Sequence, residues 1–329
     1  MTELLENYSL STKPKKKKGV LQKVGIVGCG LMGQEITLEI SKHGIDVVFI
    51  DVSESKIKKI MASMSVHLDE IIDKWGLTVS EKRAILSRIK GSTDYSQLKD
   101  CNLIIESINT KKRGTSYEKR QEIFREIEKH VSRDTVITSN TATLMISEIS
   151  KVLKYPERSV GVHFISPVRK VKILEVVKGE KTANWAFEFV GRFATMINKT
   201  VINLHESPGN ISTRMIIPLI NEACEILMEG VATIESIDIT MKEASGHEFG
   251  PFEMADRIGL DMILKMMDNL YQKFGDQKFK PSPIIILLVR ANCIGLKAGK
   301  GFYKYEDGKA IPLCLKDLFS IELKKIIKS

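Results

Sequence analysis

The sequence predicts an α/β domain with a mainly parallel sheet, followed by an all-α domain at the C-terminus. Up to residue 204, short runs of apolar and β-branched residues occur, and helical patterns separate the earlier runs. This alternation is typical of parallel strands joined by helical crossovers. From about Ile211 onward, amphipathic helical patterns replace the strand signals. A chain of 329 residues is long enough for two such domains.

The elements can be assigned in order along the chain. We expect strands at KVGIVGCG, IDVVFID, CNLIIES, DTVITSN, SVGVHFIS, KILEVV and TVINL. Residues 53–90 are charged and periodic, with a break at WGLT, which predicts two antiparallel helices inserted beside the sheet. Residues 182–198 show helical periodicity, as do STRMIIPLINEACEILMEG, IESIDITMKEA and GLDMILKMMDNLYQKFG.

The composition narrows the class of protein. The sequence is 43% hydrophobic and 28% charged, as in ordinary globular proteins. No apolar run approaches the roughly 18 residues of a membrane helix, and the first residues lack the order of a signal peptide, so we expect a cytoplasmic protein. The five cysteines are scattered and form no CxxC pair, which argues against a disulfide framework or a metal site.

The net charge of +9 comes in part from a lysine run at 13–18, which we interpret as a solvated tail. The charges are not interleaved with aromatic residues, so we expect no nucleic-acid partner. The remaining positive charge favours an anionic partner, such as a nucleotide, coenzyme A or an acidic carrier protein.

A glycine motif lies between the first strand and the first helix. Gly28, Gly30 and Gly33 form GxGxxG, in which the glycines allow a tight turn, a close approach of the pyrophosphate and close helix packing. Asp51 ends the second strand at about the interval expected for an acid that binds the adenosine ribose. Its charge would repel a 2′-phosphate. The motif predicts a Rossmann-type domain that binds NAD in preference to NADP.

Many further segments resemble the 3-hydroxyacyl-CoA dehydrogenase family, which includes bacterial 3-hydroxybutyryl-CoA dehydrogenases. The matching segments are VGIVGCGLMGQEI, LIIES, SNTATL, GVHFISP, ILEVV, SPGNISTR, NEACEILMEG, IDITMK, GPFEMADRIGLD and KAGKGFYKY. They cover about 23–305 in family order. The resemblance implies an NAD-dependent dehydrogenase that interconverts a 3-hydroxyacyl thioester and its 3-oxoacyl form. We divide the chain into a basic flexible tail (1–19), an NAD-binding domain with the helical hairpin (20–206) and a helical substrate and dimerisation domain (207–329).

The resemblance also implies a catalytic pair, His163 in GVHFISP and Glu175 in ILEVV. Both residues lie in apolar, strand-rich surroundings, where an unpaired charge is costly and a partner is expected. A neutral imidazole can take the proton of a hydroxyl, while a carboxylate fixes its tautomer and stabilises the imidazolium. The cofactor-binding residues that we expect are Gly28, Gly30, Leu31, Met32, Gly33, Asp51, Glu106 and Asn140.

The chain departs from the family pattern on the substrate side. The SNTS motif reads SNTA, so that Ala142 replaces a serine beside Thr143, and HFFNP reads HFISP, which places Ser166 at an asparagine position. PGFxxNR reads PGNISTR, so that Thr213 replaces an asparagine while Asn210 appears three residues earlier. Each lost polar partner is worth about 1 kcal/mol. We therefore assign these five residues to the substrate side and expect an altered specificity.

Two local features suggest an alternative acyl carrier. The hairpin turn reads DKWGLT instead of a lysine-rich sequence, and a basic loop follows Glu106 at 111–113. A basic loop suits an acidic acyl carrier protein, and related dehydrogenases act in polyketide extender-unit pathways. A solvated loop is an equal interpretation. Two alternatives stay open, namely a dehydrogenase of small hydroxy acids without coenzyme A and a non-catalytic NAD-binding subunit.

The helical domain is expected to form a homodimer. The segments MIIPLI and PIIILLV are more apolar than a thin helical layer can cover within one chain, and such a surface usually marks an interface. The final segment, from about Glu306 onward, is amphipathic and predicts an extra helix that packs on the body.

Overall fold

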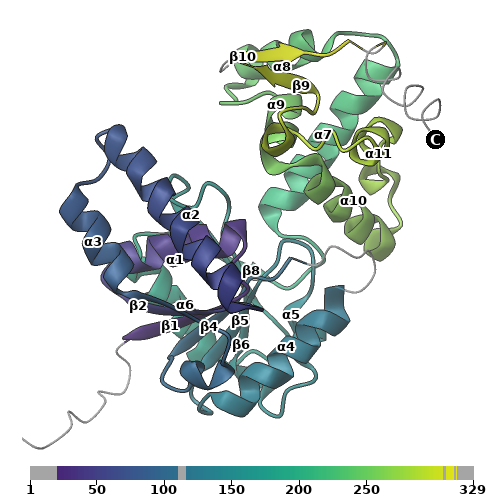
Figure 1. The fold of residues 1–329 in the computed structure, drawn as a ribbon. Coiled ribbons are helices and arrows are strands. Elements are labelled where there is room, and N and C mark those ends of the chain that lie inside the picture. The colour runs from purple at the N-terminus through teal and green to yellow at the C-terminus, as the bar shows by residue number, and fades with distance from the viewer. Residues whose placement is uncertain (1–20, 110–115, 307–308, 315, 317–329) are drawn as a thin grey trace, which may run out of the picture.

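The computed structural model describes residues 21–109, 116–306, 309–314 and 316. An eight-stranded sheet with helices on both faces forms one body, and the helices from α7 onward form a second (Figure 1). The expected order of an α/β domain and a helical domain is confirmed. The last strand of the sheet ends at His205 and α7 begins at Ile211, and we propose residue 207 as the division between them. No described helix is long and apolar enough to cross a membrane.

The sheet has the strand order β3-β2-β1-β4-β5-β6-β7-β8. All neighbours are parallel except β6 and β7. Its strands are β1 (Lys23–Val27), β2 (Asp46–Ile50), β3 (Ile89–Ser92), β4 (Leu103–Glu106), β5 (Val136–Asn140), β6 (Ser159–His163), β7 (Ile173–Lys178) and β8 (Thr200–His205). The strand β3 was not predicted, because IKGS buries only one apolar side chain, that of Ile89.

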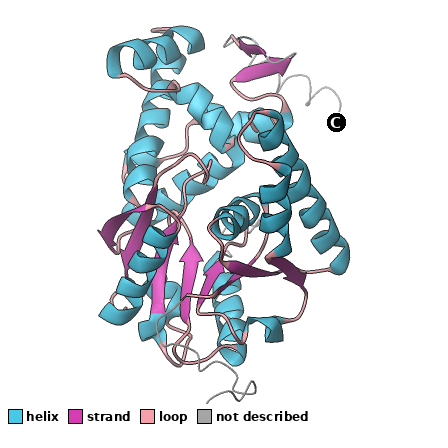
Figure 2. Ribbon diagram, turned by 90° about the vertical axis from the view of Figure 1, so that its left-hand side faces the viewer, coloured by secondary structure: helices cyan, strands magenta, loops and turns pink. Residues whose placement is uncertain are grey.

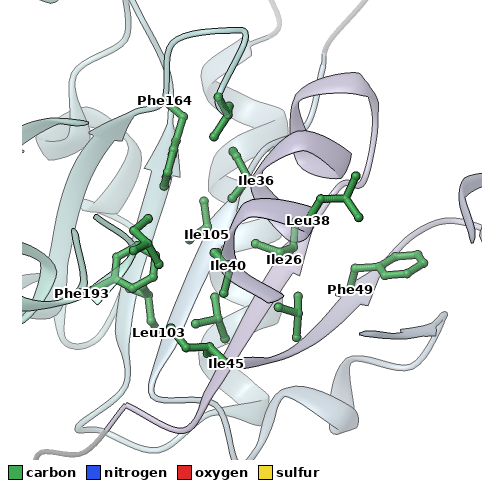
Figure 3. Close-up of a cluster of buried hydrophobic side chains, with 14 of the residues drawn as sticks. Ile26, Ile36, Leu38, Ile40, Ile45, Phe49, Leu103, Ile105, Phe164 and Phe193 are labelled. Carbon is green, nitrogen blue, oxygen red and sulfur yellow. The ribbon is translucent and has the colours of Figure 1, made fainter. Parts of the chain in front are cut away.

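Helices cover both faces of this sheet. They are α1 (Leu31–Lys42), α2 (Glu54–Asp73), α3 (Val79–Ser87), α4 (Ser116–His130), α5 (Ile146–Ser150) and α6 (Asn184–Met196). The strand β4 shows how the alternation of side chains builds two cores. Leu103 and Ile105 point to the core under α1 and α6 (Figure 3), whereas Ile104 packs with the apolar residues of α4 and α5 on the other face.

The two helices expected within 53–90 are α2 and α3, and they form a hairpin (Figure 1). Ser53 caps α2 by accepting a hydrogen bond from Lys56 N. Thr78 and Glu81 form a capping box at the start of α3, which satisfies two backbone N–H groups at once. Local capping signals therefore explain where both helices begin.

The second body contains α7 (Ile211–Met228), α8 (Ile234–Ser245), α9 (Pro251–Ile258), α10 (Leu260–Phe274) and α11 (Pro283–Arg290) around its own apolar core. It also holds a two-stranded antiparallel sheet, β9 (Tyr303–Glu306) and β10 (Lys309–Pro312), at the end far from the large sheet (Figure 2). We expected no strand after Ile211, and this prediction was wrong for both β9 and β10. The helix expected from about Glu306 is likewise absent at 309–312, where the chain forms β10. Most of the segment beyond lies outside the described residues.

The physical reason for this small sheet is a buried carboxylate. Asp256 accepts hydrogen bonds from Phe302 N and Tyr303 N, both at 2.9 Å. Tyr305 Oη donates a third, at 3.0 Å. These contacts hold β9 in an extended conformation against α9, and the exposed β10 pairs along it. These partners lie 46 to 49 positions after Asp256, and a local apolar pattern does not reveal contacts over such a separation.

Candidate active site

The glycine turn after β1 is shaped for close approach by a ligand. Gly28 has φ +88°, which favours glycine, and a Cβ on Gly33 would lie 2.4 Å from Gly28 O. A Cβ on Gly30 would meet no atom within 4 Å, so the backbone is open there. Gly30 caps α1 without a side-chain hydrogen bond, and Leu31 is exposed while Met32 is half-buried.

These features fit a dinucleotide. The open backbone at Gly30 and the N-terminus of α1 can receive a pyrophosphate, because the first N–H groups of a helix attract anions. The thiol of Cys29 within the turn is buried, and burial raises its pKa to about 12, so the thiol stays neutral and adds no charge that would oppose a phosphate. The residues at the turn therefore match the expected binding of NAD.

Asp51 lies beside this turn, at the end of β2. Its Oδ2 accepts a hydrogen bond from Cys29 N at 3.0 Å, and its Oδ1 accepts one from Val52 N at 2.7 Å. Lys56 Nζ lies 2.7 Å from Asp51 Oδ1. The hydrogen bond from Cys29 N holds the Asp51 carboxylate against the glycine turn, which is compatible with the predicted contact to the adenosine ribose. The ion pair with Lys56 was not predicted from the sequence.

Glu106 lies at the end of β4. Its carboxylate is fully buried and is paired with Arg120, while Ser139 Oγ donates to it at 2.6 Å and Ile108 N at 2.7 Å. Arg120 Nη2 also donates to Ile108 O at 3.1 Å. Ile108 in turn lies against Gly28. We propose that Glu106 supports the loop that packs against the glycine turn. Its contact with the cofactor stays a prediction.

His163 and Glu175 are brought together by the antiparallel pairing of β6 and β7. The two residues face each other in the strand register, and His163 Nδ1 lies 2.7 Å from Glu175 Oε2. The carboxylate can only accept, so Nδ1 carries the proton and Nε2 is the basic nitrogen. The Glu175 side chain is 2% exposed and that of His163 is 13% exposed. The contact expected from the sequence is present.

Ser212 completes this pair, and the sequence analysis missed it. At the start of α7, Ser212 N donates to Glu175 Oε1 and Ser212 Oγ donates to Glu175 Oε2, both at 3.0 Å. Ser212 Oγ is also 3.5 Å from His163 Nδ1. Burial alone would raise the pKa of Glu175, but the hydrogen bonds from His163 and Ser212 outweigh it and hold that pKa below its ordinary value. The carboxylate therefore stays ionised beside the imidazole.

The loop after β5 meets the start of α7. Asn210 N donates to Ala142 O at 3.0 Å, and Asn210 Nδ2 donates to Thr141 O at 3.1 Å. Thr143 Oγ1 accepts from Asn269 Nδ2 of α10 at 2.9 Å. Ala142 and Asn210 are thus brought near the His163–Glu175 pair through α7. The Thr143 hydroxyl points toward α10, where it accepts the hydrogen bond from Asn269. It therefore does not simply replace the hydroxyl of the serine that is missing at position 142.

The remaining predicted site residues are dispersed. Asn140 Oδ1 accepts from Phe164 N at 2.9 Å and so joins the ends of β5 and β6. Ser166 Oγ donates to Glu35 Oε1 of α1 at 2.8 Å, which directs this hydroxyl toward α1. Thr213 is buried in the first turn of α7, directly after Ser212. The basic loop residues 111–113 lie outside the described residues.

Comparisons with known proteins place the chain among dehydrogenases over most of its length. The chain matches the model for the NAD-binding domain of 3-hydroxyacyl-CoA dehydrogenase over residues 23–207 and the model for its C-terminal domain over 209–305. It is 36% identical over 287 residues to a 3-hydroxybutyryl-CoA dehydrogenase of Clostridioides difficile, a match that covers 86% of this chain and 99% of that protein.

Two further comparisons point in the same direction. A 3-hydroxybutyryl-CoA dehydrogenase of Bradyrhizobium diazoefficiens is 34% identical over 293 residues, with 89% of this chain and 98% of that protein covered. The crystal structure of an (S)-3-hydroxybutyryl-CoA dehydrogenase from Ralstonia eutropha is similar, with a TM-score of 0.79 and 35% identity. That match covers 88% of this chain and all of the other.

Proposed function

The chain belongs to the 3-hydroxyacyl-CoA dehydrogenase family of NAD-binding oxidoreductases, and on this premise we propose that His163 and Glu175 form its general-base pair. In this role they interconvert a 3-hydroxyacyl thioester and its 3-oxoacyl form. The observation that carries the proposal is the 2.7 Å contact between His163 Nδ1 and Glu175 Oε2. It leaves Nε2 as the basic nitrogen of the ring.

In the proposed reaction His163 transfers the proton, and Glu175 stabilises the protonated ring. Bound at the glycine turn, NAD would supply the acceptor for the hydride that leaves the carbon carrying the hydroxyl group. His163 Nε2 takes the hydroxyl proton, and the resulting imidazolium is stabilised by the ionised Glu175, to which its Nδ1–H still donates. In the reductive direction the imidazolium returns this proton to the 3-oxo oxygen. The low pKa of Glu175 supports this role, because the carboxylate stays charged in both states of the ring.

Ser212 acts as a positioning residue in this proposal. Its hydroxyl and its backbone N–H each hold one oxygen of Glu175. Because Ser212 belongs to α7 and Glu175 to the sheet, the orientation of the carboxylate depends on how the helical body sits on the sheet. The N-terminus of a helix also favours negative charge, which adds to the stabilisation of the ionised carboxylate.

Family membership implies an acyl-CoA substrate, and we propose that the specificity for the acyl group is altered. Ala142 offers no hydroxyl, and the side chain of Asn210 donates to a backbone carbonyl. Ser166 and Thr143 are engaged with α1 and α10. A substrate that relatives recognise through polar groups at these positions would bind this chain less tightly than it binds the relatives. The names of the similar proteins support coenzyme A as the carrier and a short 3-hydroxyacyl chain as the first substrate to test.

The test is a comparison of carriers. The enzyme and NAD are mixed with 3-hydroxybutyryl-CoA, and separately with the same acyl group on an acyl carrier protein, and the absorbance of NADH is followed. We expect turnover of the coenzyme A thioester. Faster turnover of the carrier-protein thioester would move the substrate assignment to that carrier. NAD binding without turnover across a panel of 3-hydroxyacyl thioesters and free hydroxy acids would contradict a catalytic role.

We also propose a homodimer formed through α7 and α8. Three apolar side chains on these helices are exposed to solvent. They are Met215, which is 70% exposed, Ile211 one turn before it on α7, and Ile239 on α8. The segment PIIILLV supports this less than we expected, because Ile284, Ile285 and Leu288 pack inside the helical core. Light scattering should give twice the mass of one chain. The mass of a single chain at micromolar concentration would contradict the dimer.

A further inference from the structure

Glu35, in the second turn of α1, holds the segment that follows His163. Its Oε1 accepts a hydrogen bond from Ser166 Oγ at 2.8 Å, and its Oε2 accepts one from Val168 N at 2.7 Å. The side chain of Glu35 is half-buried, so water competes only in part for these two contacts. Both oxygens of one carboxylate therefore fasten the segment to α1.

The carbonyl group of Val168 is held from the same helix. Lys199 Nζ donates to Val168 O and lies 3.3 Å from Glu39 Oε1. Glu39 comes four positions after Glu35 and so lies on the same face of α1, and both Lys199 and Glu39 are buried. Val168 is 1% exposed, and an unpaired N–H group at such a position is costly. The two backbone groups of this residue thus have fixed places relative to α1.

The start of the segment is fixed by apolar packing as well. Phe164, directly after His163, lies in the same core as Ile36 of α1 (Figure 3). Asn140 Oδ1 accepts from Phe164 N at 2.9 Å, which joins the segment to the end of β5. A displacement of the segment at its contacts with Glu35 would therefore reach His163 over only a few residues.

These contacts connect the two elements that hold the reacting groups. The glycine turn and the first turn of α1 are the expected place of the dinucleotide, and β6 carries His163 at its end. Hydride and proton leave the same substrate, so their two acceptors need a fixed relative position. A misplacement of about 1 Å can lower a rate about 10²-fold. Glu35 belongs to the first element and contacts the segment that continues the second.

We propose that Glu35 is a positioning residue for His163. It fixes residues 164–168 against α1 and so sets the direction of the imidazole relative to the bound dinucleotide. In this role the hydroxyl group of Ser166 holds the segment, and Glu35 itself touches neither the substrate nor the cofactor. The inference rests on the proposed function of His163 as the general base.

Two substitutions at position 35 test the proposal. Glu35→Ala removes both acceptors and should lower kcat for the 3-hydroxyacyl thioester about tenfold, part of the effect of a full displacement. The KM for the thioester and the affinity for NAD should change by less than about twofold. Glu35→Gln should keep at least about half of kcat, because its carbonyl oxygen can accept from Val168 N while its amide group donates to Ser166 Oγ. The value of kcat is expressed per NAD-binding site, measured by fluorescence titration, so that unfolded protein does not enter it.

Glu188→Ala is the matched control, since Glu188 is an exposed acid of another helix, α6, and should leave kcat unchanged. Ser166→Ala removes one of the two contacts and should lower kcat less than Glu35→Ala does. The double variant should be no slower than Glu35→Ala, because groups that act through one contact are not additive.

The outcomes separate this role from the general base. Unchanged kcat per site in Glu35→Ala, with turnover lost in His163→Ala, would overturn the positioning role and leave the base in place. Equal losses in Glu35→Gln and Glu35→Ala would overturn it too, because the charge and not the held segment would then matter. Turnover retained in His163→Ala would remove the proposed function and this role of Glu35 with it.

Discussion

Glu106 and Glu175 are buried carboxylates of the same sheet, but their partners give them different chemical properties. Each accepts three hydrogen bonds, Glu106 from Arg120, Ser139 and Ile108 N, and Glu175 from His163 and twice from Ser212. The partner of Glu106 is a guanidinium, which stays protonated in proteins. The partner of Glu175 is an imidazole, which can gain and lose a proton near neutral pH.

The comparison shows that burial of an acid does not by itself indicate catalysis. Arg120 is paired with Glu106, and together they hold Ile108, because Glu106 accepts from its N–H and Arg120 donates to its carbonyl. This pair is therefore suited to support a loop. The His163–Glu175 pair has one partner whose charge can change and whose side chain is partly exposed. Only this second pair is suited to move a proton, and the following three experiments test that distinction.

The largest effect is expected for His163→Ala. Loss of the general base should lower kcat/KM for the 3-hydroxyacyl thioester by about 10²- to 10⁴-fold. The affinity for NAD, measured by fluorescence titration, should change by less than about twofold, because the His163 ring is not part of the glycine turn. His205→Ala, at an exposed position on β8, is the control and should retain its activity. Unchanged turnover in His163→Ala would eliminate the mechanism.

A large loss of stability, and not of chemistry, is expected for Arg120→Met. The substitution leaves Glu106 buried without its cation, which costs about 3–5 kcal/mol in the free energy of unfolding, measured by denaturant titration. Lys119→Met is the matched control. Lys119 pairs with Glu122 at 2.9 Å on the surface, where the side chains are 57% and 59% exposed, so its loss should cost about 0–1 kcal/mol. Similar losses in the two variants would show that the buried pair is not the support we describe.

The smallest effect is expected for Ser212→Ala. One hydrogen bond to Glu175 is lost, worth about 1 kcal/mol or about fivefold in kcat/KM. Because Ser212 helps to lower the pKa of Glu175, that pKa should rise toward its ordinary value. A carboxyl group with a lowered pKa in the fold stabilises the protein above its unfolded pKa, and this stabilisation is lost as the pH falls through the folded pKa.

The stabilisation that ionised Glu175 contributes should therefore be smaller in Ser212→Ala than in the unsubstituted protein, and it should be fully lost at a higher pH. The fall of kcat/KM on acidification should shift to higher pH in the same direction. Ser212→Thr keeps a hydroxyl group at this position and should restore the original pH profile. The measurements are kcat/KM and the free energy of unfolding between pH 4 and pH 7. A uniform loss of activity with an unshifted pH profile in Ser212→Ala would indicate a purely structural role.

Several features could be predicted because they depend on local patterns. The glycine turn and Asp51 follow from the spacing of residue types after two apolar strands. The pairing of His163 with Glu175 was predicted from the family resemblance. In the structure it results from the antiparallel register of β6 and β7. The short strands β3, β9 and β10 were not predicted, because they bury few apolar side chains and lie at the edges of their sheets.

The amino-acid sequence by itself determined where the apolar strands and amphipathic helices lie and which residue types meet at the glycine turn, since periodicity and glycine geometry act over a few positions. Only the tertiary structure decided which donors complete each buried carboxylate. Ser212 reaches Glu175 across 37 positions, Lys56 shields Asp51, and Ser166 turns to Glu35. The direction of a polar side chain depends on which partners the packing of distant elements brings within hydrogen-bond distance.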